Sequence, residues 1–325
     1  VLGGAWGWAG SEGSLATALR LASRHLPDGM RLTAQDVSGT LRGGGRIGTL
    51  HFAGPDIDVQ VQDARIAWQP AALLERQLLI TELHAGRVAL RPLGEPDASP
   101  AQPLTELRLP LRIRTPFAAE ALTWAAGAQA PMAISDLRGH YDWDGAAHRL
   151  RLDSIALAQG RYTLDATLEG AAPMALRAAL QGAVQTPVPG SEAPLTAAVQ
   201  AQADGTLAGD AAQLAVSAQV LGAAGNALRL QAQARIRPWA AQPVVQAQAS
   251  LQALDLAALW PRAPATRLSG TASLQPEELP TQDGWALKAD LTNENPGPWD
   301  THHLPVSALQ ATARYAGTLL QVPDA

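Results

Sequence analysis

The segment Leu228-Arg-Leu-Gln-Ala-Gln-Ala-Arg-Ile236 decides the fold class of this 325-residue chain. Its apolar residues occupy every second position, and arginine or glutamine fills each position between them. Successive side chains of a β-strand point to opposite faces, so the segment has one dry face and one wet face. This pattern is typical of an antiparallel sheet that is solvated on one side.

The same alternation recurs along most of the chain. It is found at residues 106–114, 161–169, 214–220, 245–251, 285–291 and 309–315. The pairs Asp144-Gly145, Asp204-Gly205 and Asp283-Gly284 predict tight hairpins between strands. Loops rich in proline and small polar residues are predicted near 94–103 and 186–194. The sequence therefore predicts an all-β fold, an extended curled antiparallel sheet that forms a groove.

Helices are predicted to be few and short. A stripe of leucines and alanines predicts an amphipathic helix within residues 11–29, capped by Ser14 and ended by Pro27-Asp-Gly29. Shorter helical turns are predicted at Ala71–Arg76 and Asp255–Trp260. Three short helices cannot cover so many strands, so the sheet either curls on itself or leaves part of its apolar face open.

The N-terminal segment Val1-Leu-Gly-Gly-Ala-Trp-Gly-Trp8 is apolar and holds two tryptophans. Tryptophan gathers at membrane interfaces, so we interpret residues 1–10 as the remnant of a membrane anchor, with Trp6 and Trp8 close to the membrane. The alternative is an ordinary flexible terminus. The remaining residues, 30–325, form the elongated β-groove region, with possible subdivisions near 94–103 and 186–194.

Composition and motifs argue against several classes of protein. The formal net charge of -5 argues against nucleic acid as a partner. His302 and His303 are adjacent, so in a strand they would point to opposite faces and could not easily share a metal ion. The run Asp142-Trp-Asp144-Gly145 fits a hairpin turn better than a calcium loop, because the other calcium ligands are missing. We therefore predict no enzymatic activity, no cofactor and no metal.

The inward faces of the middle strands are predicted to line an apolar path. Their members alternate with polar residues in each strand, and many inward neighbours are alanines that would leave room inside a curled sheet. The alternative is that these residues fill a closed core, which fits the same pattern. The predicted lining residues are Leu107, Leu109, Leu111, Ile113, Leu150, Leu152, Tyr162, Leu164, Leu168, Leu176, Leu180, Leu214, Val216, Leu228, Leu230 and Ile236.

Several segments resemble one known family. They include Gly10-Ser-Glu-Gly-Ser-Leu15, Val37-Ser-Gly-Thr-Leu41, Ile66-Ala-Trp68-Gln-Pro70 and Leu291-Thr-Asn-Glu-Asn-Pro-Gly-Pro-Trp299. In these segments the chain resembles the N-terminal part of TamB-type translocation and assembly module proteins, within the AsmA-like group. The resemblance implies an inner-membrane-anchored protein of a Gram-negative bacterium that crosses the periplasm. It also implies a β-taco groove like that of bridge-like lipid transfer proteins.

The resemblance leaves two functions open. One is movement of phospholipid toward the outer membrane through the apolar groove, which makes phospholipid the expected partner. The other is a scaffold for outer-membrane β-barrel or autotransporter assembly with a TamA-type partner, whose binding region is not evident in this chain. Alternation cannot separate the two, because a one-sided sheet has both an apolar face and strand edges.

Overall fold

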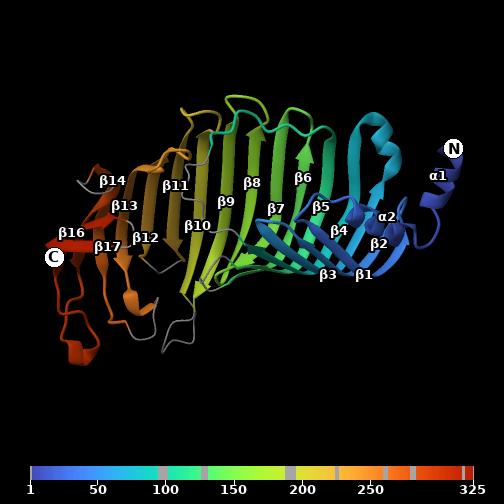
Figure 1. The fold of residues 1–325 in the computed structure, drawn as a ribbon. Coiled ribbons are helices and arrows are strands. Elements are labelled where there is room, and N and C mark those ends of the chain that lie inside the picture. The colour runs from blue at the N-terminus through green and yellow to red at the C-terminus, as the bar shows by residue number, and fades with distance from the viewer. Residues whose placement is uncertain are drawn as a thin grey trace. The chain divides into compact units, whose positions relative to one another are not determined.

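The computed structural model describes residues 2–93, 102–125, 131–186, 195–223, 227–258, 263–278, 283–316 and 319–324. Within them the chain forms seventeen strands, two α-helices and three short 3-10 turns, so the predicted all-β fold with a short N-terminal helix is confirmed (Figure 1). It divides into two compact units. Unit 1 comprises residues 1–99, 107–158 and 162–170, and unit 2 comprises residues 100–106, 159–161 and 171–325.

Unit 1 contains both α-helices and the first eight strands. Its sheet is antiparallel except between β4 and β5, which are parallel and need the long crossover of residues 93–111. The elements are α1 (Leu2–Ala9), α2 (Ser14–Arg24), β1 (Arg31–Thr40), β2 (Gly44–Ala53), β3 (Ile57–Gln69), η1 (Pro70–Glu75), β4 (Gln77–Pro92), β5 (Arg112–Trp124), β6 (Met132–Trp143), β7 (Ala147–Leu157) and β8 (Gly160–Glu169).

Unit 2 is a meander in which each strand pairs antiparallel with the next. Its elements are β9 (Ala175–Thr186), β10 (Leu195–Thr206), β11 (Gln213–Gly222), β12 (Arg229–Ile236), β13 (Val244–Leu254), η2 (Leu256–Ala258), β14 (Leu268–Glu278), β15 (Asp283–Asn293), η3 (Trp299–Thr301), β16 (Ala308–Ala316) and β17 (Leu319–Asp324). Neither unit closes into a barrel in the part of the chain that is described, because consecutive strands simply add to an open sheet.

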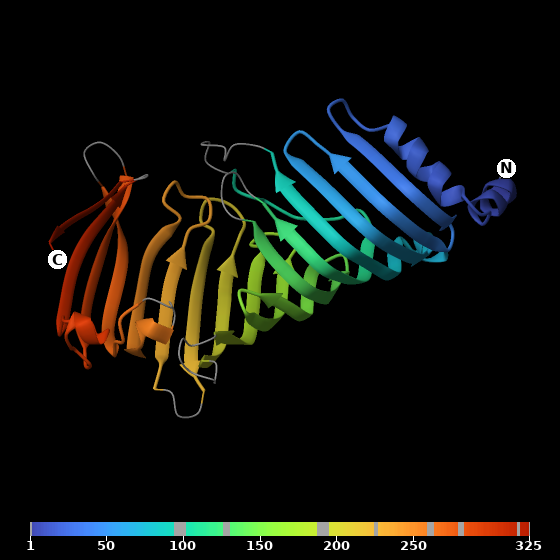
Figure 2. The same cartoon turned by 90° about the horizontal axis from the view of Figure 1, so that it is seen from below.

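Helix α2 lies alongside β1 (Figure 2), but its predicted cap is wrong. Gly13, with a left-handed φ of 80°, occupies the cap position, and Ser14 lies inside the first turn. The Ser14 hydroxyl instead donates to the Ala9 carbonyl at 3.1 Å and accepts from the Leu41 N–H at 2.9 Å. Ser14 is buried because it ties the helix to the turn that follows β1.

The other predicted helices are 3-10 turns. The turn predicted at 71–76 is confirmed as η1, with Pro70 at its start. The turn predicted at 255–260 is found only as the three-residue η2, and Trp260 lies outside the described residues.

Two of the three predicted hairpin turns are wrong. Asp144-Gly145 does join β6 to β7. Asp204-Gly205 lies inside β10, because Gly205 pairs with both Leu176 and Leu214 and the ladder continues through it. Asp283-Gly284 opens β15 rather than forming the turn before it. The predicted loops at 94–103 and 186–194 lie mostly outside the described residues.

The predicted strand over residues 106–114 is also wrong in its first half. β5 begins at Arg112, and Leu107, Leu109 and Leu111 belong to the preceding crossover. The Leu107 N–H donates to the Gly170 carbonyl at 2.9 Å, so this segment runs past the ends of other strands. Proline at position 110 removes a ladder donor from the alternating run, which explains why the alternation did not produce a strand.

One transverse row interrupts the pairing of unit 1 in strand after strand. In the β1–β2 pair the register skips Asp36 and Gly48, which lie opposite one another. The same row continues through Asp63 of β3, Gly86 of β4, Glu120 of β5 and Asp136 of β6. We call these six residues the interrupted row. At each of these pairs both strands leave out the same number of residues, so the ladder is interrupted without a shift in register.

The three aspartates of the interrupted row have left-handed backbones, with φ of 53°, 53° and 51° at Asp36, Asp63 and Asp136. Aspartate tolerates this conformation better than most residues. A Cβ added at Gly48 would lie 2.7 Å from the Cβ of Asp36, so the opposing position requires glycine. Each of the six strands thus leaves one residue of the row out of the pairing while its apolar residues stay on one face.

Candidate functional site

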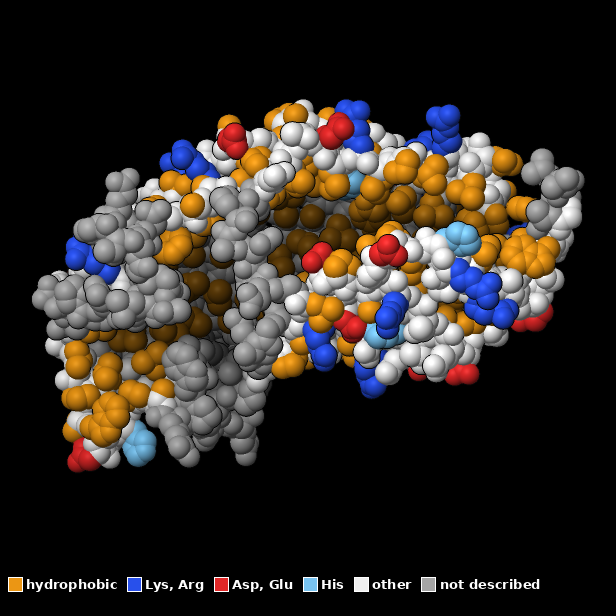
Figure 3. All heavy atoms as spheres, in the orientation of Figure 1, with side chains coloured by type: hydrophobic (Ala, Val, Ile, Leu, Met, Phe, Trp, Pro, Cys, Tyr) orange, Lys and Arg blue, Asp and Glu red, His pale blue; other side chains and the backbone are white. Residues whose placement is uncertain are grey.

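The apolar face of unit 1 continues on both sides of the interrupted row. At this row the apolar residues of each strand are three positions apart instead of two. The pairs are Ala34 and Val37, Ile47 and Leu50, Val61 and Ala64, Ala85 and Val88, Ala119 and Leu122, and Ile134 and Leu137. Ile47, Ala85 and Ala119 are buried, and the others are half-buried. Over β1 to β8, Figure 3 shows a hollow floored by hydrophobic side chains, with charged side chains outside it.

The predicted lining residues of unit 1 divide into two groups. Ile113, Leu150, Leu152, Tyr162, Leu164 and Leu168 lie on strands and are half-buried. In the cross-strand register Ile113 faces Trp143, and Leu150 and Leu152 face Tyr141 and Gly139. Leu109 and Leu111 are half-buried in the crossover, and Leu107 is exposed there. The crossover group therefore borders the ends of the strands instead of lining their inward face.

Seven alanines lie side by side across unit 2, one on each strand from β10 to β16. They are Ala201, Ala218, Ala232, Ala249, Ala272, Ala289 and Ala311, and each pairs with the next. We call this row the alanine lane. Directly paired residues of antiparallel strands share a face, so the lane crosses the strands on the apolar face. All seven alanines are half-buried.

Bulkier side chains flank the alanine lane mainly on one side and at three positions on the other, where Ala203, Ala234, Ala247 and Ala313 complete the row. Val220, Leu230, Leu251 and Leu291 lie in the first of these rows, and Val216, Leu274 and Leu287 lie in the second. A hollow of about 230 Å³ lies on this face, lined by the alanines of β11 to β14 together with Val216, Leu274 and Leu287. The lane is therefore part of a shallow apolar surface, bordered by larger side chains mainly on one side.

The opposite face of unit 2 is polar and also hollow. A space of about 1240 Å³ is lined by polar residues, including Gln233, Gln248, Thr271, Lys288 and Asp290, together with alanines that include Ala249, Ala272, Ala289 and Ala311 of the lane. A twisted sheet is concave along a different diagonal on each of its faces, which accounts for two hollows on one sheet. The volume of a hollow therefore does not show which face binds a ligand. The side chains that line each hollow are the more informative property.

The predicted lining residues of unit 2 share the apolar face. Leu214 pairs with Ile236, and Val216 and Leu230 lie in the rows beside the alanine lane. Leu176 pairs with Gly205, and Leu180 pairs with Ala201 at one end of the lane. Leu228 precedes β12, and its carbonyl accepts from the Gly222 N–H at 2.8 Å. All seven predicted residues of unit 2 are half-buried.

A buried aromatic cluster lies where the β6–β7 hairpin meets the crossover that precedes β5. Trp143 is only 2% exposed and stacks on His148 with ring centroids 4.1 Å apart. His148 Nδ1 lies 2.7 Å from the Tyr141 hydroxyl, and its Nε2 lies 2.8 Å from the Leu107 carbonyl. Burial raises the pKa of the Tyr141 hydroxyl, and the nearby Asp142 charge adds to this. The cluster fixes the crossover against the β6–β7 hairpin.

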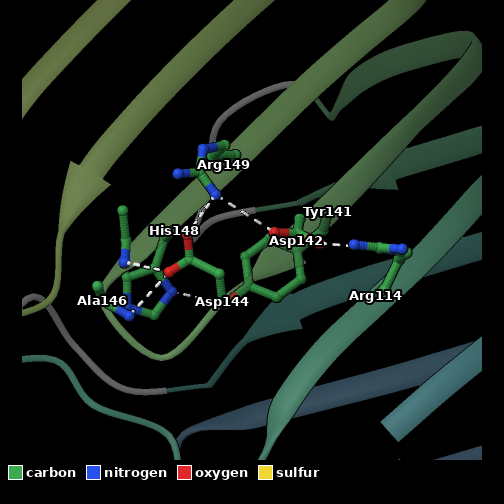
Figure 4. Close-up of polar contacts among 8 residues, drawn as sticks. Arg114, Tyr141, Asp142, Asp144, Ala146, His148 and Arg149 are labelled. Atoms are coloured by element: carbon green, nitrogen blue, oxygen red, sulfur yellow. Dashed lines mark hydrogen bonds and ion pairs between the residues drawn. The ribbon is translucent and has the colours of Figure 1, made fainter. Parts of the chain in front are cut away.

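Charged pairs cover the outer side of the same hairpin (Figure 4). Arg149 bonds Asp144 at 2.6 Å, and Arg114 bonds Asp142 at 3.1 Å. The N–H groups of Ala147 and Ala146 donate to the Asp144 carboxylate and, with Arg149, lower its pKa to about 2. These groups pair with one another at the surface. Each carboxylate of this cluster therefore has an arginine partner.

Other candidate chemical groups are also explained by surface pairing. The Asp58 carboxylate lies 2.6 Å from His51 Nε2, and this hydrogen bond lowers the pKa of Asp58. His302 and His303 lie beside η3, where His303 Nδ1 is 2.8 Å from the Thr301 carbonyl. No group of three potential metal ligands occurs among the described residues. In the same part of the chain, no helix combines the length and apolar character needed to cross a membrane.

Two features of the apolar faces were missed by sequence reasoning. The interrupted row had a signal, since apolar residues three apart recur in six strands of unit 1. The alanine lane had a weaker signal, since only cross-strand register brings its members together from residues 201 to 311. Alternation within one strand cannot reveal a row that runs across strands.

Comparison with known proteins identifies the family. The family described as TamB, N-terminal domain, matches residues 1–173, which is slightly more than half of the 325 residues. No curated protein matches the chain. No solved structure matches it either. The family match and the open one-sided sheet agree, and the chain belongs to the TamB family of bacterial envelope proteins, whose role lies in lipid transport or assembly.

Proposed function

We propose that the apolar faces of this chain bind the acyl chains of phospholipid and carry them toward the outer membrane. In this proposal the chain is the periplasmic part of an inner-membrane-anchored protein. The observation that supports it is the partial burial of the apolar faces. Of the sixteen predicted lining residues, Leu107 is exposed and the others are half-buried. A closed core would bury such residues almost completely.

The alanine lane suits an acyl chain. Neighbouring strands lie about 4.8 Å apart, so seven strands give a lane of roughly 30 Å. Each methylene removed from water contributes about 0.8 kcal/mol, and a half-sheltered chain of about ten methylenes gains several kcal/mol. Because the lane has an alanine on each strand, its affinity for an acyl chain is similar at each position along the lane. Uniform affinity favours sliding over trapping.

The polar face supports the choice of the apolar face as the binding surface. Gln231 and Gln233 flank Ala232 in β12 and point to the opposite side of the sheet. Amides, hydroxyls and charges keep that side hydrated, so the sheet can stay soluble while its other face holds lipid. An assembly scaffold would use strand edges for pairing and would not need a continuous apolar row.

The test is to purify the chain by gentle extraction and measure bound phospholipid by mass spectrometry. We expect phospholipid with the parent, and much less with an Ala249→Phe variant, whose ring fills the alanine lane. Ser250→Phe is the matched control, because Ser250 is on the polar face of the same strand. Absence of lipid from the parent, together with binding of unfolded outer-membrane β-barrel segments, would favour the scaffold function.

Two further parts of this proposal concern partners. Residues 1–10, with Trp6 and Trp8, are the membrane-proximal end and join the chain to the inner membrane. A TamA-type outer-membrane protein is the partner of a region outside this chain. The family match supports a link to outer-membrane assembly machinery. Neither partner changes the expected chemistry of the apolar faces.

A further inference from the structure

Two exposed apolar elements lie at the N-terminal end of unit 1. Helix α1 has the sequence LGGAWGWA, without a polar side chain, and its Trp6 and Trp8 are 50% and 45% exposed. In the turn η1, Leu73 is 39% exposed and Leu74 is 91% exposed. An apolar side chain as exposed as Leu74 has no partner within the fold, and exposed apolar groups that cluster mark a contact surface.

The two elements are joined through one turn. The Arg42 N–H donates to the Ala9 carbonyl at the end of α1, at 2.8 Å. The preceding carbonyl, of Leu41, accepts from the Trp68 indole N–H at 2.7 Å, and η1 begins two residues after Trp68. Figure 1 shows α1 and the N-terminal strands at this end of unit 1. The turn Leu41–Arg42 therefore holds both apolar elements near the same edge.

The projection of Leu74 is built into the backbone. Pro70 starts η1, and Arg76 closes it in a left-handed conformation with its N–H directed at the carbonyls of Ala72 and Leu73. The Arg112 guanidinium donates to the Glu75 carbonyl at 3.2 Å, and the Arg112 N–H donates to the Arg76 carbonyl at 3.0 Å. Leu74 is thus held at the tip of a braced turn.

We propose that Trp6, Trp8, Leu73, Leu74 and Arg42 form a membrane-contact patch that inserts into the headgroup region of a phospholipid bilayer. The patch matches such a surface in three respects. Tryptophan prefers the interface between headgroups and acyl chains. The Arg42 guanidinium lies 5.5 Å from the Trp6 ring centroid, so a cation and an aromatic face stand together where anionic headgroups meet acyl chains.

The third respect is shape and charge. Leu74 stands out from the surface, and a protruding side chain needs a matching pocket in a protein partner but none in a fluid bilayer. Arg42, Arg76 and Arg112 outnumber Glu12 and Glu75 around the patch, and the Glu12 carboxylate already accepts the Gly39 N–H at 2.7 Å. The local positive excess favours a surface that contains anionic lipid.

The patch adds a second contact to the membrane-proximal role proposed for Trp6 and Trp8. It places the β3–β4 connection of unit 1 against the bilayer, so that the beginning of the apolar face lies next to a source of lipid. The contact does not depend on whether the apolar faces carry lipid. A chain that fails to retain phospholipid can still bind vesicles through the patch.

The experiment is co-sedimentation of the purified 325-residue chain with vesicles of phosphatidylethanolamine and phosphatidylglycerol. We expect the double variant Leu73→Asp, Leu74→Asp to lose about tenfold or more of the bound fraction. The matched control is Leu93→Asp, because Leu93 is 51% exposed and follows the opposite end of β4. Circular dichroism checks that both variants keep the parent fold.

An environment-sensitive fluorophore on a Leu74→Cys variant gives an independent measurement. We expect its emission to shift to the blue with vesicles and to be quenched by bromine atoms placed on the upper acyl chain. Unchanged sedimentation of the double variant, or a fluorophore that stays in water, would overturn the proposal. A blue shift without vesicles that rises with protein concentration would assign the patch to a second copy of the chain and would also overturn it.

Discussion

Tryptophan side chains fix the ends of the strands by donating to carbonyls of neighbouring connections. The Trp68 and Trp143 indoles donate to Leu41 and Leu109, at 2.7 and 3.3 Å. In unit 2 the Trp239 indole donates to Leu207 at 2.8 Å. A buried tryptophan needs a partner for its N–H, and these bonds provide one while the ring covers the strand end. The tryptophans thus seal edges of the units and leave the apolar faces open.

The buried ring of Trp143 gives a direct prediction. Trp143→Ala should lower the free energy of unfolding by about 3–5 kcal/mol, because it leaves a cavity and removes the stack on His148. Thermal melting checks this. Trp299→Ala is the control, since Trp299 is well exposed on η3 and its loss should change stability by less than about 0.5 kcal/mol. Equal melting temperatures for the two variants would contradict this role.

Asp144 predicts a pH dependence. Its folded pKa of about 2 lies below the unfolded value of about 3.9, so its stabilisation is present above pH 4 and is lost as the pH falls toward 2. Asp144→Ala should cost about 1 kcal/mol at neutral pH, because the N–H groups of Ala146 and Ala147 lose their acceptor. Melting temperatures of parent and variant should converge between pH 4 and pH 2. A constant difference across that range would show that the carboxylate charge plays no part.

At the scale of strands, the interrupted row leaves residues of unit 1 out of the pairing while keeping apolar residues on one face. Its aspartates carry a backbone conformation that β-branched residues avoid. We therefore expect the contribution of these aspartates to stability to depend on backbone preference more than on charge.

Two variants of Asp63 separate these causes. Both Asp63→Asn and Asp63→Val remove the exposed ion pair with Arg46. Asparagine tolerates the left-handed backbone and should leave stability nearly unchanged, whereas valine should lower it by about 1–2 kcal/mol. Chemical denaturation measures the difference. Equal losses in both variants would assign the role of Asp63 to its ion pair and not to the row.

The elements also show what the sequence could predict. Alternation predicted the one-sided antiparallel sheet because the period of two is set by backbone geometry alone, but it left undecided whether the sheet closes on itself. It failed at 107–111, where proline and a parallel strand pair required a crossover, and at Asp204-Gly205, where cross-strand pairing continued through a turn-like dipeptide. The alanine lane was beyond reach because it depends on the register of seven strands. Register is a relation between strands, and local sequence specifies it only weakly.

At the scale of the whole molecule, both units carry the same arrangement, with an apolar face that is only half-buried and a polar face that is hydrated. Each unit can therefore be tested on its own terms. Leu164 of β8 represents unit 1, and the alanine lane represents unit 2. A face that binds lipid must tolerate water when lipid is absent, which a closed core does not.

Leu164→Asp tests that tolerance. In an open face the carboxylate stays hydrated, so the melting temperature should remain close to that of the parent while co-purified phospholipid falls. Thr167→Asp, on the outward side of the same strand, should affect neither quantity. Unfolding of the Leu164→Asp protein would show a sealed core, because burying an unpaired carboxylate costs several kcal/mol.

The central claim is that phospholipid contacts the apolar face and not the polar face. Placing a photo-crosslinking amino acid at Ala232 and, separately, at Gln233 tests this most directly, because the two positions are adjacent in β12 and point to opposite sides. Each protein is irradiated in cells and analysed by mass spectrometry for covalently attached lipid. We expect phospholipid adducts at position 232 and few at position 233. Equal labelling at both positions, or labelling only at position 233, would contradict the account.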